Sequence, residues 1–251
     1  MTDQSLARPS ISLSRIGALA VVRARRVVRT RLALAALVLA LLPWALVDAH
    51  SLLSRLSSLT EFSLAGLTLL GAGAVGDDLA SGEYAIAMTH DVSPVEMLAG
   101  QAAASLALGA TLVGLQLPIA LAGVAIPSIV PLMLCIVWLA ALLAGWLALM
   151  LLLATFLDGK ANAVAMLGLL FLPIVDATLL ERLPHAPAVV IRNTLQLLPQ
   201  LSHATTMFRV LLSRSPGTMI APFVLILSPL FYFAWASLRL YRLEPAGRLT
   251  Q

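Results

Sequence analysis

Residues 76–101 read GDDLASGEYAIAMTHDVSPVEMLAGQ and form a polar island between two long apolar segments. The island has five carboxylates and neither Lys nor Arg, its acidic residues being Asp77, Asp78, Glu83, Asp91 and Glu96. Ser93-Pro94-Val95-Glu96 has the pattern of a capping box, in which the Ser93 hydroxyl accepts from the Glu96 amide and the Glu96 carboxylate accepts from the Ser93 amide. Pro94 suits the first position of a helix. We therefore expect a helix to begin at Pro94 and to continue into the apolar segment behind it.

The composition excludes an ordinary soluble domain. Of the 251 residues, 60% are hydrophobic and only 11% are charged, whereas soluble domains have about a quarter charged residues. Several apolar runs reach the roughly 20 residues that a helix needs to cross a bilayer. Backbone groups in lipid must be satisfied within their own segment, which favours helices over isolated strands. The expected fold class is therefore all-α, as a single polytopic membrane domain.

The apolar runs predict six transmembrane helices, at about 32–47, 59–75, 94–125, 132–156, 163–180 and 219–238. Residues 1–9 are expected to be disordered, and 10–31 to form a basic amphipathic helix at the inner membrane surface. An alternative for 10–31 is a basic flank that only fixes topology. The membrane domain would span 32–242, with a cytoplasmic tail at 243–251.

Lys and Arg are distributed unevenly between the two sides of this layout. With the N-terminus inside, the inner side holds the ten arginines near the termini plus Lys160, and the outer side holds five arginines. Positive residues accumulate on the cytoplasmic side. We therefore expect a multi-pass protein of the cell (inner) membrane with both termini and the acidic loop in the cytoplasm. Because the arginines flank the predicted spans, topology explains the basic balance, and no nucleic-acid partner is expected.

Short helices are expected outside the spans as well. Leu79–Met88 predicts a short helix in the acidic loop, although Ser81 and Gly82 weaken its start. Val189–Leu198 and His203–Leu212 have apolar faces at helical spacing, which predicts short interfacial helices on the outer side.

The loop resembles a known family. The spacing of Asp78, Ser81-Gly82-Glu83, Ser93-Pro94 and Glu96-Met97-Leu98 before Gly100 resembles the loop after the second span in permease subunits of ATP-binding-cassette (ABC) type-2 transporters. Two positions depart from the family pattern: the turn lacks the usual Arg after Pro94, and Gln101 stands where Lys is common. The layout of six spans with both ends inside also resembles that family over nearly the whole chain.

The resemblance implies a function and a set of partners. The chain would be the permease subunit of an ATP-driven exporter, working as a dimer with an identical or homologous protomer and two separately encoded ATPase subunits in the membrane lipid. Those subunits would bind ATP and Mg²⁺, so no catalytic residue, metal or cofactor is expected in this chain. Loop 77–92 would dock on the ATPase as a coupling helix, through the candidate residues Asp77, Asp78, Glu83, Tyr84, Met88 and Asp91. The cap at Ser93, Pro94 and Glu96 would fix the start of the third span behind this loop.

The motifs of nucleotide and metal sites are missing from the sequence. No G-x-x-x-x-G-K-[ST] motif occurs, and Gly71-Ala72-Gly73-Ala74-Val75-Gly76 fits G-x-G-x-x-G only at the end of a predicted span, which is the wrong context for dinucleotide binding. There is no H-E-x-x-H motif, and the single cysteine, Cys135, excludes an intrachain disulfide.

Three other interpretations remain open at the level of sequence. The acidic loop could be a solvated connector. The chain could be an ion-coupled secondary transporter or channel, for which Asp176 and Glu61 are the candidate ionisable residues near spans, although Asp176 also fits an interfacial residue bonded to Arg182 or to water. The third is a membrane component of heme or copper maturation that uses the predicted outer histidines, namely His50, His185 and His203.

Overall fold

The computed structural model describes residues 11–45, 51–72, 76–80, 82, 92–126, 128–179, 198–213 and 220–243, without the side chains of residues 43, 80, 171–179, 213 and 243. These residues form helices and connecting turns, with no strand among them. The helices are α1 (Leu13–Val28), α2 (Arg31–Leu41), the 3₁₀ helix η1 (Leu42–Ala45), α3 (Leu52–Gly71), α4 (Gly76–Ala80), α6 (Pro94–Leu121), α7 (Ile129–Ala154), α8 (Gly159–Leu179), α10 (Leu201–Ser213) and α11 (Ile220–Leu243). The expected all-α class is thereby confirmed for the described part of the chain.

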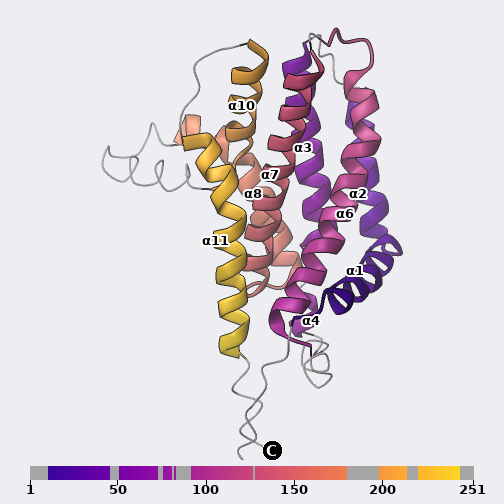
Figure 1. Cartoon of the computed structure of the whole chain (residues 1–251), viewed down its shortest axis with the longest axis vertical. Coiled ribbons are helices and arrows are strands. Elements are labelled where there is room, and N and C mark those ends of the chain that lie inside the picture. The colour runs from indigo at the N-terminus through magenta and orange to yellow at the C-terminus, as the bar shows by residue number, and fades with distance from the viewer. Residues whose placement is uncertain are drawn as a thin grey trace, which may run out of the picture.

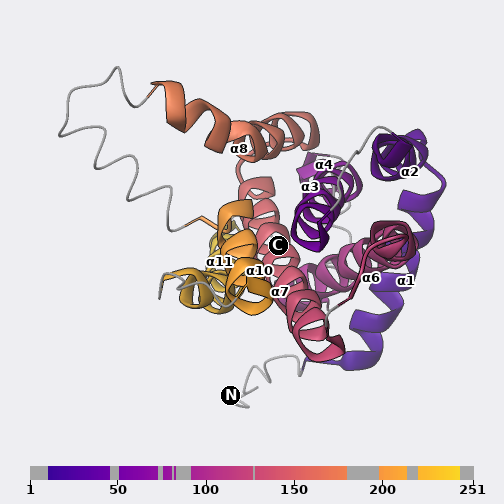
Figure 2. The same cartoon turned by 90° about the horizontal axis from the view of Figure 1, so that it is seen from above.

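The long helices form a bundle (Figure 1). In that view α2, α3, α6, α7 and α11 follow the long axis, and α1 lies across one end, close to α4. The last turns of α11 lie at this α4 end, whereas α10 lies at the opposite end. Seen from above, α8 stands at the edge of the bundle and α1 runs along the outside of α6 and α2 (Figure 2).

α7 is the central helix of the bundle. It packs against α3, α6, α8, α10 and α11. Its residues Leu142, Leu147 and Met150 are fully buried. A helix that is apolar on all sides can be covered by other helices or by lipid, and in α7 the second half, from Leu142 onward, is the part that the other helices cover.

Within the described part of the chain, three helices are long and apolar enough to cross a membrane, namely α6, α7 and α11. α2 is apolar but shorter, and so is the part of α8 at 159–170. α3 has 20 residues but includes Arg55 and Glu61 besides several Ser and Thr residues. These findings indicate a membrane protein. Each of the six predicted spans overlaps one of the helices α2, α3, α6, α7, α8 and α11, although the span predicted at 59–75 meets a helix that begins earlier, at Leu52, and ends at Gly71.

The N-terminal segment differs from the expectation at two places. The predicted helix over 10–31 is interrupted after Val28 by a turn, in which the Thr30 hydroxyl donates to the Val27 carbonyl at 2.6 Å. The predicted span at 32–47 consists of α2 and then the 3₁₀ helix η1, which contains Pro43. Proline lacks an N–H and clashes with the carbonyl four residues earlier, so the α-helix ends before it.

Polar side chains inside the bundle bond to one another across helices. Trp146 Nε1 on α7 donates to Thr68 Oγ1 on α3 at 2.9 Å. Gln116 on α6 accepts from Trp44 Nε1 at 3.3 Å and donates to Ser63 Oγ on α3 at 3.4 Å. In lipid there is no hydrophobic force between helices, so such bonds contribute to holding them together.

Candidate functional site

The start of α6 is fixed by the capping box that the sequence predicts. Ser93 Oγ accepts from the Glu96 amide at 3.2 Å, and Glu96 Oε2 accepts from the Ser93 amide at 2.8 Å. Pro94 occupies the first turn. Two of the backbone donors that every helix start leaves open are thereby satisfied, and α6 begins at the residue expected.

The same carboxylate also holds the N-terminus of α1. Glu96 is fully buried, and its second oxygen, Oε1, accepts from the Ser12 amide at 2.8 Å. Ser12 is the residue that precedes α1. A buried carboxylate must be hydrogen-bonded to be tolerated, and here both oxygens have backbone N–H donors, one from Ser93 and one from Ser12, which is 84 residues from Glu96. Glu96 therefore joins the beginning of α1 to the beginning of α6.

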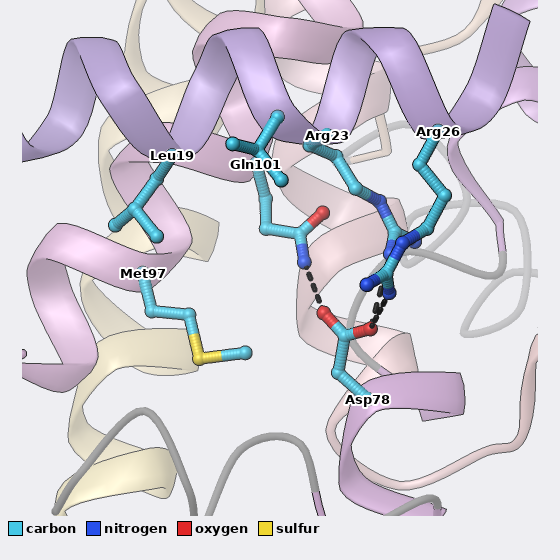
Figure 3. A pocket seen from close by; sticks show the side chains of 7 residues that line it. Leu19, Arg23, Arg26, Asp78, Met97 and Gln101 are labelled. Carbon is cyan, nitrogen blue, oxygen red and sulfur yellow. Dashed lines mark hydrogen bonds and ion pairs between the residues drawn. The ribbon is translucent and has the colours of Figure 1, made fainter. Parts of the chain in front are cut away.

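Asp78 on α4 forms a second connection between the same elements (Figure 3). Its Oδ1 accepts from Arg23 Nη1 at 3.0 Å, and its Oδ2 accepts from Gln101 Nε2 at 2.6 Å. Arg26 Nη1 lies 3.6 Å from the same Oδ1. The side chains of Asp78 and Arg23 are 8% and 13% exposed, whereas Arg26 is 50% exposed. The pair with Arg23 is therefore the shielded one, and solvent screens the contribution of Arg26.

α1 and α6 cross closely at Gly100. A Cβ atom at this position would lie 2.7 Å from Leu19 Cβ and 3.4 Å from the Ile16 carbonyl oxygen on α1. The 2.7 Å distance is shorter than real Cβ atoms show, so glycine permits this close approach of the two helices. We call Ser12, Arg23, Asp78, Glu96 and Gln101 the α1 anchor, because these residues join α1 and α4 to α6 around the Gly100 crossing.

A small pocket of about 120 Å³ lies under α1 beside the α1 anchor. Figure 3 shows that its polar side chains converge on Asp78 while Leu19 and Met97 lie together at the other side. The lining residues are Leu19, Val22, Arg23, Arg26, Asp78, Met97 and Gln101. Two arginines face one carboxylate here, which disfavours a metal cation, and no group of three potential metal ligands occurs among the described residues. The charged side chains of this pocket pair with one another, so the arrangement is suited to holding α1 in place.

Of the predicted docking residues, the structure describes Asp77 and Asp78. Asp77 is exposed, whereas Asp78 is buried in the α1 anchor. Glu83, Tyr84, Met88 and Asp91 lie outside the described residues, so their predicted role stays a prediction. Asp78, the acidic residue that carries the resemblance to the family, is thus bonded to other residues of this chain. Its neighbour Asp77 faces solvent.

The short helix of the acidic loop also differs from the expected one. α4 spans Gly76–Ala80, and Gly82 has φ +76°. This left-handed conformation ends a right-handed helix and is readily adopted only by glycine. A single helix over Leu79–Met88 is therefore wrong, because Gly82 interrupts it. Residues 83–91 lie outside the described part of the chain.

Sequence reasoning did not assign four functional candidates of this region, namely Ser12, Arg23, Gly100 and Gln101. One signal was present: the loop has carboxylates without Lys or Arg, and the segment expected at the same membrane surface is rich in arginine. Opposite charges on one surface predict pairing in general. They do not identify which arginine meets which carboxylate.

A further polar contact lies where α3 leads toward α4. Asn162 on α8 is fully buried, and its Nδ2 donates to the Ala72 carbonyl at 2.9 Å and to the Met150 carbonyl at 3.1 Å. One amide thereby satisfies a carbonyl at the end of α3 and a carbonyl of α7. The chain is fixed at Ala72, four residues before α4 begins.

The candidate residues of the alternative functions are placed only in part. His203 is buried at the start of α10, and its Nδ1 accepts from the Gln200 amide at 3.3 Å. His50 and His185 lie outside the described residues. Glu61 is exposed on α3, and the side chain of Asp176 on α8 lies outside the described part. Among the carboxylates whose side chains are described, those that are buried are Asp78 and Glu96, both at the α4 end.

Comparison with known proteins does not place the chain in a family. No family model matches it, and no curated protein matches it. The resemblance to ABC type-2 permeases therefore rests on the residues of the acidic loop and on the layout of the helices.

Proposed function

We propose that this chain is the membrane-spanning permease subunit of an ATP-driven ABC exporter. The observation that carries the proposal is the connection of Asp78 to Gln101 and Arg23 at 2.6 and 3.0 Å. Through it, the start of the predicted ATPase-docking loop is bonded directly to α6, a long apolar helix. A loop that is to transmit a push needs such a connection, whereas a solvated connector does not.

In this proposal the energy for transport comes from a separate subunit. Loop 77–92 docks on the ATPase, where Asp77, Glu83 and Asp91 meet basic groups and Tyr84 and Met88 supply apolar contact. ATP-driven closure of two ATPases moves the loop. α6 has 28 residues, about 42 Å at 1.5 Å per residue, so it reaches from the loop to the far side of a bilayer. Its capped, closely packed start favours rigid-body movement over local bending.

The six-span layout with both ends inside belongs to the same proposal. It is supported by the overlap of the six predicted spans with helices and by the position of α1, α4 and the end of α11 at one end of the bundle (Figure 1). The bias of Lys and Arg makes that end cytoplasmic. A second permease protomer, identical or homologous, completes the transporter, and substrate passes between the two.

The first test is recovery of an ATPase subunit. The chain is tagged at its N-terminus, native membranes are solubilised gently, and partners are identified by mass spectrometry. An ATPase in roughly equal amount supports the proposal. Glu83→Lys is expected to reduce this recovery, because it reverses a charge in the docking loop, and Glu244→Lys in the predicted cytoplasmic tail serves as the charge-matched control. Unchanged recovery and transport in Glu83→Lys would contradict loop docking.

The alternatives have tests of their own. Transport that survives ATP depletion and is lost in Asp176→Asn or Glu61→Gln would identify an ion-coupled transporter. Joint substitution of His50, His185 and His203 addresses heme or copper handling. His203 Nδ1 is already bonded to a backbone amide, so we expect that substitution to act through the fold of α10.

A further inference from the structure

α1 uses one side of its surface to contact the rest of the chain. Leu19 meets Gly100 on α6, and Arg23 pairs with Asp78 on α4. Val27 packs against the cluster of Ala36 and Leu70 from α2 and α3. These residues recur at intervals of four, so they lie on one helix face. These contacts do not cover the other faces of α1.

The edge of α1 that points away from α4 is apolar. Val21 and Val28 are seven residues apart and therefore lie on the same edge. They are 51% and 59% exposed. The opposite edge includes Arg26, which faces Asp78 on α4. Because α4 lies at the end of the bundle (Figure 1), the valine edge faces away from that end, along the long axis that the candidate membrane helices follow.

Two arginines lie between these edges, on the outward face of α1. Arg25 and Arg29 are four residues apart, so their side chains project from the same strip of the helix. Both are exposed, and neither has an ion-pair partner among the residues that the structure describes. The strip borders the exposed valines. A strip of cationic groups beside an apolar edge matches the boundary between lipid headgroups and acyl chains.

We propose that Arg25 and Arg29 form a binding surface for anionic phospholipid, with the valine edge in contact with the acyl region. The guanidinium groups pair with the lipid phosphate through charge-assisted hydrogen bonds. An acidic surface of a soluble protein would complement the arginines but would leave Val21 and Val28 in water. This inference does not depend on the exporter proposal, since it concerns only how α1 sits on the membrane.

Native mass spectrometry of the purified full-length chain in detergent measures the binding constant of individual lipids. Phosphatidylglycerol is the anionic probe and phosphatidylcholine the neutral one. Arg25→Gln/Arg29→Gln is expected to weaken phosphatidylglycerol binding on the order of 25-fold, since each of the two arginines at a membrane surface contributes about a fivefold effect. Phosphatidylcholine binding should stay unchanged. Arg25→Lys/Arg29→Lys keeps the charges and should keep most of the preference.

Arg55→Gln/Arg209→Gln is the charge-matched control, because it removes two arginines from the predicted outer side. It should leave phosphatidylglycerol binding as in the unmodified chain. Equal binding of the two lipids by the unmodified chain, or an unchanged preference in Arg25→Gln/Arg29→Gln, would overturn the proposal. The proposal would also be overturned if Arg25→Gln/Arg29→Gln lost a co-purifying protein while its lipid binding stayed intact. The melting temperature of each variant shows that the fold is retained.

Discussion

Arg23 Nη1 donates to Asp78 Oδ1 at 3.0 Å, although the two residues are 55 positions apart in the chain. The bond joins the amphipathic helix α1 to the first turn of the acidic loop. Gln101 completes the contact from α6. Three segments that the sequence presents as an interfacial helix, a loop and a membrane span therefore meet at one carboxylate.

Neutralising Asp78 should destabilise the protein far more than neutralising its neighbour. In Asp78→Asn the shielded Arg23 guanidinium loses its counter-charge, and we expect a loss on the order of 2–3 kcal/mol in the free energy of unfolding. Asp77→Asn is the matched control: Asp77 is exposed, so we expect less than about 0.5 kcal/mol. Denaturant unfolding of the purified chain in one detergent gives both values. Equal stability of the two variants would mean that the ion pair does not hold α1.

A methyl group at the α1–α6 crossing should separate the two helices. Gly100→Ala introduces a Cβ 2.7 Å from Leu19 Cβ, and we expect it to cost about 1–3 kcal/mol through overpacking. Gly114→Ala on the same helix is the control, since a Cβ there meets nothing within 4 Å. The control should be neutral or slightly stabilising, because alanine is the better helix former. A stability change of the same size in both variants would contradict the close crossing.

Removing the Glu96 carboxylate should release the N-terminus of α1. In Glu96→Ala the Ser12 amide loses its acceptor, so we expect the hydrogen exchange of this amide to accelerate on the order of tenfold. Mass spectrometry of peptides from 11–20 measures this exchange. Ser93→Ala removes the cap hydroxyl but leaves Glu96 Oε1 on Ser12. It should weaken the start of α6 by about 1 kcal/mol without changing exchange at Ser12. Faster exchange at Ser12 in both variants would show that the two bonds are not separable.

The bond between Trp146 and Thr68 should give a measurable coupling between α7 and α3. A double-mutant cycle with Trp146→Phe and Thr68→Val isolates the 2.9 Å hydrogen bond. Interhelical bonds in membrane proteins average about 0.6 kcal/mol, and we expect a coupling energy of that size. Trp138→Phe provides the control tryptophan on the same helix, and its cycle with Thr68→Val should give no coupling. A zero value for the Trp146 cycle would leave α7 and α3 joined by packing alone.

Local signals predicted the helices well. The start of α6 at Pro94 follows from Ser93 and Glu96, which are three residues apart and complete their bonds within one turn. The predicted span at 132–156 coincides with α7 at Ile129–Ala154, because length and hydropathy alone define such a helix. Gly82 is one exception beside the turn after Val28 and the 3₁₀ helix at Pro43, since a glycine in a short polar segment is compatible with a weak helix or with a break.

The candidate site could not be predicted in the same way. Its bonds join residues 55 and 84 positions apart, and no periodic pattern relates Arg23 to Asp78 or Ser12 to Glu96. Sequence reasoning assigned Asp78 to a contact with an ATPase subunit, because the loop resembles the ATPase-docking loop of ABC type-2 permeases. The structure buries Asp78 under α1, and the close crossing at Gly100 brings α1 near enough to reach it.

The α1 anchor also sets an order of events during synthesis. Ser12 and Arg23 leave the ribosome long before Glu96 and Asp78 exist, so α1 can contact α2 and α3 early but cannot form the bonds of the α1 anchor until the chain has been made past Gln101. In the proposed topology, a chain whose α6 entered the bilayer in the wrong direction would place Glu96 on the opposite side from Ser12. Final docking of α1 would then require that the helices between these two residues have the correct orientation.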